Sequence, residues 1–235
     1  MNSELGIQRR ALLAAAGAGL VLSLGAGASA QAIPDGLTGL LAAASDRALD
    51  RLAQPGAFYN DTAVRIQLPG VGNLGSQGGS LLGGLAGEVA GMTGLDGVTR
   101  KINDAGDRAA QAAKPIFHAA ISRLTLSDVP GIATQRDGGT QYLRRTAGGE
   151  LRAKVRPLID TALTAVGAFQ AIESLSGPGG LLRSLGLTRE SVGASVTDQA
   201  LNGIYRYMAE EEAKLRANPL GFLGGAGAML GGMHF

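Results

Sequence analysis

The spacing of apolar residues along the chain is mainly helical. Between residues 41 and 52, apolar side chains recur every three or four positions with charged side chains between them, as on a surface helix that buries one face. The same spacing predicts four further helices, Asp104–Leu124, Thr140–Thr146, Glu150–Glu173 and Thr197–Ala217. Pro115 is expected to kink the first of these four or to begin a new helix. The chain is therefore expected to be an all-α, mostly helical single domain.

One segment departs from helical spacing. From Ala57 to Leu68, apolar residues alternate with polar ones, which predicts a small β-hairpin or an extended arm. Residues 70–97 are rich in glycine and are expected to form a loop. Within them, Gly70–Gly75 matches the pattern of a dinucleotide-binding turn, with Asp96 about twenty residues later. That motif also needs a second strand, and none is predicted before the next helix, so no cofactor is expected.

The first thirty residues have the features of an export signal. Arg9 and Arg10 precede a run of Ala, Leu, Gly and Val that ends with small residues at Ala28 and Ala30. Glycine and alanine dilute the run, so cleavage after Ala30 is expected rather than a permanent transmembrane helix. The paired arginines favour the twin-arginine route, whereas the residues around them leave the general secretory route open. The mature protein is expected to be periplasmic or secreted.

Composition limits the classes of function. The chain has no cysteine, which excludes disulfides, thiolate metal sites, thiol catalysis and a lipid-modified N-terminal cysteine. It has 21 basic and 19 acidic side chains, and removing the leader takes away Arg9, Arg10 and Glu4, so the charge stays nearly balanced. Neither nucleic acid nor an anionic membrane is therefore an expected partner. The helical domain is expected to span residues 31–219, and 220–235 form an uncharged Gly/Ala-rich tail.

Several ordered segments carry a resemblance to a known family. They are Ala57–Asn60, Val64–Pro69, Ala113–Ile121, Leu124–Asp128, Thr140–Leu143 and Ala209–Pro219. At these separations the chain closely resembles domain-of-unknown-function family 4197, whose members are exported or lipid-anchored bacterial envelope proteins. The resemblance covers roughly residues 36–219. It implies a mostly helical periplasmic protein, and it implies no activity.

Polar residues that match the family form the candidate site. They are Thr125, Ser127, Asp128, Thr140, Tyr142, Thr146, Glu211, Glu212, Arg216 and Asn218. If the C-terminal helix packs beside the turn at Thr125, then Asp128, Glu211 and Glu212 could supply an acid and a base. Three arginines are available to set their pKa values, namely Arg144, Arg145 and Arg216.

A structural interpretation explains the same residues without catalysis. Thr125–Asp128 has the form of a capping box, in which a hydroxyl and an acidic side chain satisfy free N–H groups at a helix start. Buried Glu–Arg pairs also fasten helix ends that cannot reach water. The structural interpretation is therefore preferred to the catalytic one.

Metal binding and hydroxyl catalysis lack the necessary spacing. His118 has Lys114 and Ser122 one turn away on its helix, and no Glu-x-x-His or His-x-His pair occurs, so no metal site is expected. Ser122 lies one turn from His118, but a helical serine lacks the exposed turn and oxyanion donors that a nucleophile needs.

Two functional hypotheses remain. The first is a non-catalytic envelope protein whose Ala-rich helices form an apolar groove for a partner protein or a lipid-like molecule, with Tyr142 or Phe117 facing a cleft. The second is a hydrolase-like enzyme that uses Asp128 with Glu211 and Glu212 on a polypeptide or cell-wall substrate. The sequence favours the first hypothesis.

Overall fold

The computed structural model describes residues 29–69, 94–125, 132, 134–176 and 187–218. It divides the chain into two compact units, Met1–Gly39 and Leu40–Phe235. The first helix crosses this boundary, and the contacts that follow all lie within the second unit. The Gly70–Gly75 motif, Ser127, Asp128 and the tail 220–235 lie outside the described residues, as do Arg9, Arg10 and Ala28 of the leader; Ala30 belongs to the first helix.

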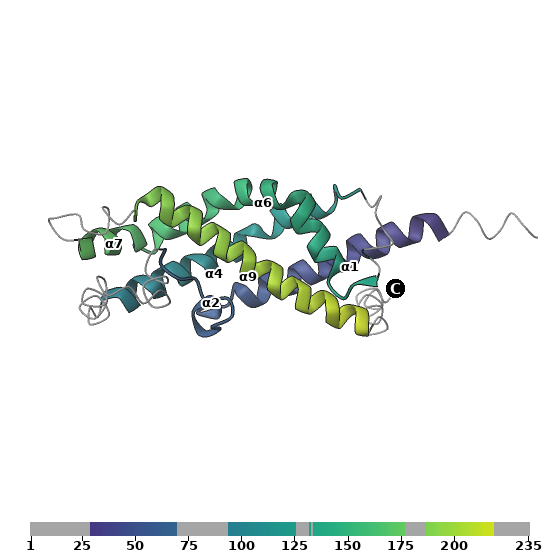
Figure 1. Cartoon of the computed structure of the whole chain (residues 1–235), viewed down its shortest axis with the longest axis horizontal. Helices are drawn as coiled ribbons and strands as arrows, with labels where there is room; N and C mark the ends of the chain where they lie inside the picture. Colours follow the sequence, from purple (N-terminus) through teal and green to yellow (C-terminus); the bar gives the residue numbers. More distant parts are fainter. Residues whose placement is uncertain (1–28, 70–93, 126–131, 133, 177–186, 219–235) are drawn as a thin grey trace, which may run out of the picture. The chain divides into compact units, whose positions relative to one another are not determined.

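The described residues form six α-helices and no β-strand (Figure 1). The helices are α1 (Ser29–Leu52), α2 (Ala57–Asn60), α4 (Gly94–Ile121), α6 (Gly138–Ala165), α7 (Ala168–Ser176) and α9 (Arg189–Ala217). The all-α fold class predicted from the sequence is confirmed.

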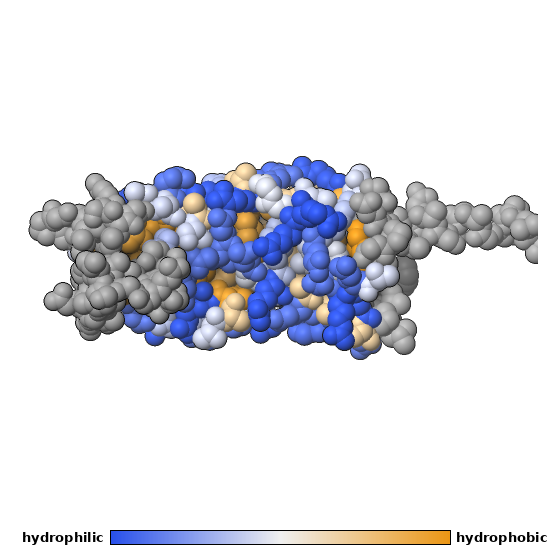
Figure 2. Space-filling model, in the orientation of Figure 1, coloured by the Kyte–Doolittle hydropathy of each residue, from blue (hydrophilic) through white to orange (hydrophobic). Residues whose placement is uncertain are grey.

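The core lies between the three long helices α4, α6 and α9. Helix α6 packs against both α4 and α9, and α4 also packs against α7. Each long helix buries a stripe of apolar side chains, and members such as Phe117, Leu151 and Ile204 are at most 1 % exposed. Full burial of one such side chain stabilises a fold by roughly 1.5–3 kcal/mol. On the face drawn in Figure 2, hydrophilic residues cover most of the described surface.

Two glycines admit Phe58, which is fully buried, between α4 and α9. A Cβ atom built on Gly106 would stand 3.1 Å from a ring carbon of Phe58, and one on Gly203 would stand 2.8 Å from another. Both distances are shorter than most real Cβ contacts, so a larger residue at either position would require the ring or the helix to shift. Phe58 thus fixes the short helix α2 to both long helices.

The predicted β-hairpin at residues 57–68 is wrong. Residues 62–64 form a turn, and the alternative of an extended arm describes only Arg65–Leu68. Ala57–Asn60 form helix α2 instead of a strand, because Gly56 has φ +79° and the carboxylate of Asp107 accepts hydrogen bonds from N–H of Gly56 at 2.6 Å and of Phe58 at 3.1 Å. Burial raises the pKa of Asp107, and the two N–H groups partly oppose this effect.

The arm is bound by amide side chains rather than by a second strand. Asn103 of α4 accepts the N–H of Ile66 at 2.8 Å and donates to the carbonyl of the same residue at 2.9 Å. Gln199 of α9 makes the same pair of bonds to Gln67, at 2.8 and 2.9 Å. These side chains take the part that a neighbouring strand has in a sheet.

Several predicted helix boundaries are wrong. Helix α4 begins at Gly94 rather than at Asp104, so it takes the last residues of the expected 70–97 loop, and it continues through Pro115. The two helices expected on either side of Gly148–Gly149 are one continuous helix, α6. The break comes later, at Gly167, whose φ of +69° strongly favours glycine. Helix α9 begins at Arg189, earlier than predicted, behind a capping box of Thr188 and Ser191.

Candidate functional site

The carboxylate of Glu212 lies against the N-terminus of α6. The side chain is fully buried. Its Oε1 atom accepts the N–H of Gly139 at 2.9 Å, and its Oε2 atom accepts both the N–H and the hydroxyl of Thr140 at 2.7 Å. Free N–H groups and the helix dipole favour an anion at this position. The local N-cap residue, Asp137, makes no such bond, so α9 supplies the cap that α6 lacks.

Arg216 completes this Glu212 cluster, which we define as Gly139, Thr140, Glu212 and Arg216. Its Nε and Nη2 atoms donate to Oε1 of Glu212 at 2.9 and 2.7 Å, and Nη2 also donates to the carbonyl of Ile132 at 3.2 Å. Glu212 therefore accepts hydrogen bonds from the backbone of one helix and from a cation one turn along its own helix. A fully buried carboxylate engaged in this way is poorly placed to exchange a proton with a substrate.

The other candidate residues have local roles. The hydroxyl of Tyr142 donates to the carbonyl of Thr125 at 2.5 Å, and that of Thr146 donates to the carbonyl of Tyr142 at 2.8 Å. Glu211 pairs with Lys214 at 2.6 Å. Asn218 ends α9, its N–H donating to the carbonyl of Lys214.

Two of the three arginines considered as partners of these carboxylates lie elsewhere. Arg144 donates to the side-chain oxygen of Asn202 at 2.8 Å, and Arg145 lies over the ring of Tyr142, 5.5 Å from its centre. Of the three arginines, only Arg216 contacts Glu212. The catalytic arrangement expected around Asp128 thus has one of its carboxylates outside the described residues and another enclosed in the Glu212 cluster.

His118 and Ser122 also have structural partners. His118 Nε2 lies 2.7 Å from a carboxylate oxygen of Asp46, which ties α4 to α1, and the hydroxyl of Ser122 donates to the carbonyl of Ala119. Among the residues that the structure describes, no group of three or more His, Asp or Glu side chains could hold a metal ion.

An open depression of about 340 Å³ lies between α6 and α9. We call it the α6–α9 depression, and its lining residues are Arg144, Gly148, Gly149, Arg152, Asp198, Leu201, Asn202 and Tyr205. It was not predicted from the sequence. Phe117 and Tyr142, of which one was expected to face a cleft, are buried, and neither lines this depression. Phe117 instead packs against the ring of Tyr205, with ring centres 6.2 Å apart.

Gly148 and Gly149 line the depression, and neither backbone conformation nor close packing requires glycine there. Neither has a positive φ. A Cβ atom on Gly148 would meet only the hydroxyl of Tyr205, at an ordinary 3.8 Å, and one on Gly149 would meet nothing within 4 Å. Because glycine inside a helix costs about 1 kcal/mol relative to alanine, α6 carries two weakening residues that packing does not require.

The hydroxyl of Tyr205 is buried and has no hydrogen-bond partner among the described residues. The residue is 6 % exposed, and burial raises its pKa to about 12, so the group is a neutral O–H donor at physiological pH. An unsatisfied buried hydroxyl costs about 1–3 kcal/mol. Such groups are rare in folded proteins, and some of them bond to a ligand or an ion.

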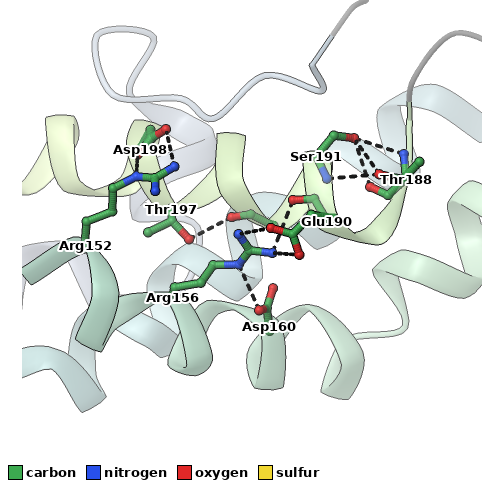
Figure 3. A network of polar contacts seen from close by, with 9 residues as sticks. Arg152, Arg156, Asp160, Thr188, Glu190, Ser191, Thr197 and Asp198 are labelled. Carbon is green, nitrogen blue, oxygen red and sulfur yellow. Dashed lines mark hydrogen bonds and ion pairs between the residues drawn. The ribbon is translucent and has the colours of Figure 1, made fainter. Parts of the chain in front are cut away.

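The charged groups at the depression consist of one ion pair and one further cation. Figure 3 shows Arg152 of α6 and Asp198 of α9 facing each other, joined by bonds of 2.5 and 3.1 Å. Arg144 has a neutral partner, Asn202, and lies over the ring of Tyr205, 5.4 Å from its centre. The lining therefore has a net positive charge.

One turn further along α6, Arg156 also joins α6 to α9. In Figure 3, Arg156 donates to Asp160 on its own helix and to Glu190 on α9. Its pKa is raised because the hydrogen bonds to these two carboxylates outweigh its burial. The Arg156–Glu190 and Arg152–Asp198 pairs both join α6 to α9.

Replacing Tyr205 with phenylalanine is expected to leave the free energy of unfolding unchanged or to raise it by about 1 kcal/mol, because an unpartnered hydroxyl is removed. Tyr207, on the same helix, is the matched control. Its hydroxyl donates to the carboxylate of Asp61 at 2.5 Å, so Tyr207→Phe is expected to lower stability by about 1.5–3 kcal/mol. Urea unfolding followed by circular dichroism measures both. A clear loss in Tyr205→Phe would show that its hydroxyl has a partner.

Fold and site together define an all-α protein with an enclosed structural cluster and an open polar depression on its long helices. No helix among the described residues has the length and apolar character needed to cross a membrane. The family model "Protein of unknown function (DUF4197)" matches residues 27–222, so the chain belongs to this family. This confirms the resemblance found in the sequence. Comparisons with curated proteins and with solved structures find no match.

Proposed function

We propose that the protein is an exported, non-catalytic binding protein of the cell envelope, and that its ligand binds in the α6–α9 depression. The contrast between the two polar sites carries this proposal. Glu212 is enclosed and accepts hydrogen bonds at both oxygens, whereas the depression is open and contains a hydroxyl without a partner among the described residues. Binding sites commonly combine a concave surface with a few polar groups that fix the ligand.

The size and lining of the depression favour a small polar ligand. A volume of about 340 Å³ is at the lower end of the range for small-molecule sites. Arg144, Arg152, Asp198 and Asn202 make the lining polar, so an acyl chain is a poor fit. The lining fits a small polar molecule or the polar head group of a lipid. It differs from the apolar groove that the Ala-rich helices were expected to form.

The proposed compartment is supported by the leader. Arg9–Arg10, the weakly apolar run and the small residues before Gln31 are typical of a cleaved export signal. Fractionation of a bacterial host that produces the full chain is expected to place the protein in the periplasm, with an N-terminus at Gln31. Changing Arg9 and Arg10 to lysine separates the routes, because only twin-arginine export is expected to stop.

Native mass spectrometry of the periplasmic protein tests the binding function. The expected result is a bound small molecule, seen as added mass above that of the processed chain. A matched protein with Gly149→Leu, whose new side chain projects where glycine leaves open space, is expected to lose that mass while remaining folded. An unprocessed chain in the cytosol would contradict the compartment. A periplasmic protein that hydrolyses envelope material would contradict the non-catalytic function.

A further inference from the structure

The hydrogen-bonding groups of the depression call for an acceptor. The hydroxyl of Tyr205 has no partner among the described residues and, at its raised pKa, can donate a proton to a hydrogen bond throughout the physiological range. Arg144 makes one hydrogen bond to a described residue, although a guanidinium has five N–H donors. Both side chains line the same depression. Arg144 can only donate, so a group that bonds to it must present a lone pair, and the hydroxyl of Tyr205 can donate to the same group.

The charge of the depression indicates how much negative charge this acceptor carries. Arg152 and Asp198 form a two-bond ion pair and largely neutralise each other. Arg144 is bonded to the neutral amide of Asn202, so its charge has no anionic partner in the lining. The net charge of the lining matches a ligand group with a single negative charge. A doubly charged group would face Asp198 with its second charge unpaired.

Resting on the proposed binding function, we propose that the α6–α9 depression recognises a singly charged oxyanion, either a carboxylate or a phosphate diester, which accepts hydrogen bonds from Tyr205 and Arg144. Arginine suits both groups because its planar fork matches their oxygens. Gly148 and Gly149 leave the backbone of α6 bare beside these donors, so the rest of the ligand can approach the helix closely. The same chemistry is found in a soluble acid and in the head group of an acidic phospholipid.

Small probes test the chemistry directly. The ¹⁵N-labelled mature protein is titrated with acetate and with dimethyl phosphate, and with acetamide as the uncharged analogue, while the amide signals of Gly148 and Gly149 are followed by NMR. Both anions are expected to give saturable shifts, with at least tenfold weaker binding for acetamide. An equal response to acetamide would overturn the oxyanion inference and leave the binding function standing. No response to any probe, together with no bound mass in the periplasmic protein, would overturn both.

Matched variants separate recognition from folding. Arg144→Gln and Tyr205→Phe are each expected to weaken acetate binding at least fivefold. Arg145→Gln is the control, because Arg145 lies over the ring of Tyr142 and does not line the depression. Unchanged affinity in both Arg144→Gln and Tyr205→Phe would overturn the proposal, whatever the probes do in the unaltered protein.

Gly148→Ala gives a variant in which stability and binding are expected to change in opposite directions. The added methyl group would stand 3.8 Å from the hydroxyl of Tyr205, within the space assigned to the oxyanion. Gly97 of α4 is the control, since a Cβ atom there meets nothing within 4 Å. Both variants are expected to raise the melting temperature, and only Gly148→Ala is expected to weaken acetate binding, by at least fivefold. Equal affinity in the two variants would contradict the assigned position.

Vesicles distinguish the two sources of the ligand. Co-sedimentation of the mature protein with phosphatidylglycerol vesicles, but not with phosphatidylcholine vesicles, would identify a lipid head group, provided that Arg144→Gln abolishes it. Binding of dimethyl phosphate or acetate without co-sedimentation would identify a soluble acid. Co-sedimentation that Arg144→Gln leaves unchanged would overturn the assignment of the depression as the head-group site.

Discussion

Replacing Glu212 with glutamine is expected to destabilise the protein by about 3 kcal/mol, the lower end of the range for breaking a buried ion pair. The amide has one acceptor oxygen, whereas the carboxylate accepts at both oxygens, from Gly139 and Arg216 at one and from Thr140 at the other. In either orientation of the amide, its NH₂ group would face N–H donors from which it cannot accept a hydrogen bond. The start of α6 is then left without an anion, and Arg216 without its carboxylate partner. Urea unfolding followed by circular dichroism measures the effect.

The matched control for this prediction is the neighbouring Glu211. Its side chain is 12 % exposed and pairs with Lys214, which is itself largely exposed. Pairs of this kind contribute about 0–1 kcal/mol, so Glu211→Gln is expected to remain within about 1 kcal/mol of the unaltered protein. If Glu212→Gln were as stable as Glu211→Gln, the Glu212 cluster would not hold α6 to α9, and a functional role for this carboxylate would regain support.

The sequence could identify Glu212 and its partner Arg216, but not the residues of α6 that Glu212 contacts. Its four-residue spacing from Arg216 indicates an ion pair on one helix, and that pair is present. The donors from α6, however, come from Gly139 and Thr140, more than seventy residues earlier. Only the packing of α9 against the start of α6 brings these residues together, and no periodicity within either helix specifies that contact.

The predicted helix boundaries were wrong where glycine lies inside a helix. The low helix propensity of glycine made Gly148–Gly149 look like a break and residues 94–97 look like loop. Ala147 and Leu151, on either side of the pair, are both buried in the core, and this packing outweighs the local weakness. The same glycines edge the α6–α9 depression. Spacing contained one usable signal, because Arg144, Gly148 and Arg152 follow each other at four-residue steps along one helix face.

Alternation predicted the extended backbone of Arg65–Leu68, but it could not predict which groups bond to it. Ile66 and Leu68 are buried, as alternation predicts for one face of an extended segment, and Val64 is buried in the turn before it. Alternation left two alternatives, a hairpin with a second strand and an extended arm without one. Single amide side chains on two helices provide the hydrogen bonds to Ile66 and Gln67. Isolated Asn and Gln residues on helices form no pattern from which this arrangement could be predicted.

Asn103→Ala is expected to destabilise the protein by about 3 kcal/mol. Asn103 and Ile66 are both fully buried, so the change leaves the N–H and carbonyl of Ile66 without partners where water cannot replace them. Two unsatisfied buried groups at about 1–3 kcal/mol each account for this loss. The bond from Asn103 to the carbonyl of Thr99 is lost as well. Urea unfolding measures the total, and amide hydrogen exchange at Ile66 is expected to accelerate.

Gln199→Ala is the matched control, because it removes an equivalent pair of bonds at an exposed position. Gln67 is exposed, and water can bond to its backbone groups once the amide is gone. The expected loss is below about 1 kcal/mol. The two variants together test whether the arm is held mainly from α4 or equally from both helices. Equal losses would mean that Asn103 and Gln199 hold the arm equally, and would contradict the expectation that burial makes the Asn103 bonds the stronger pair.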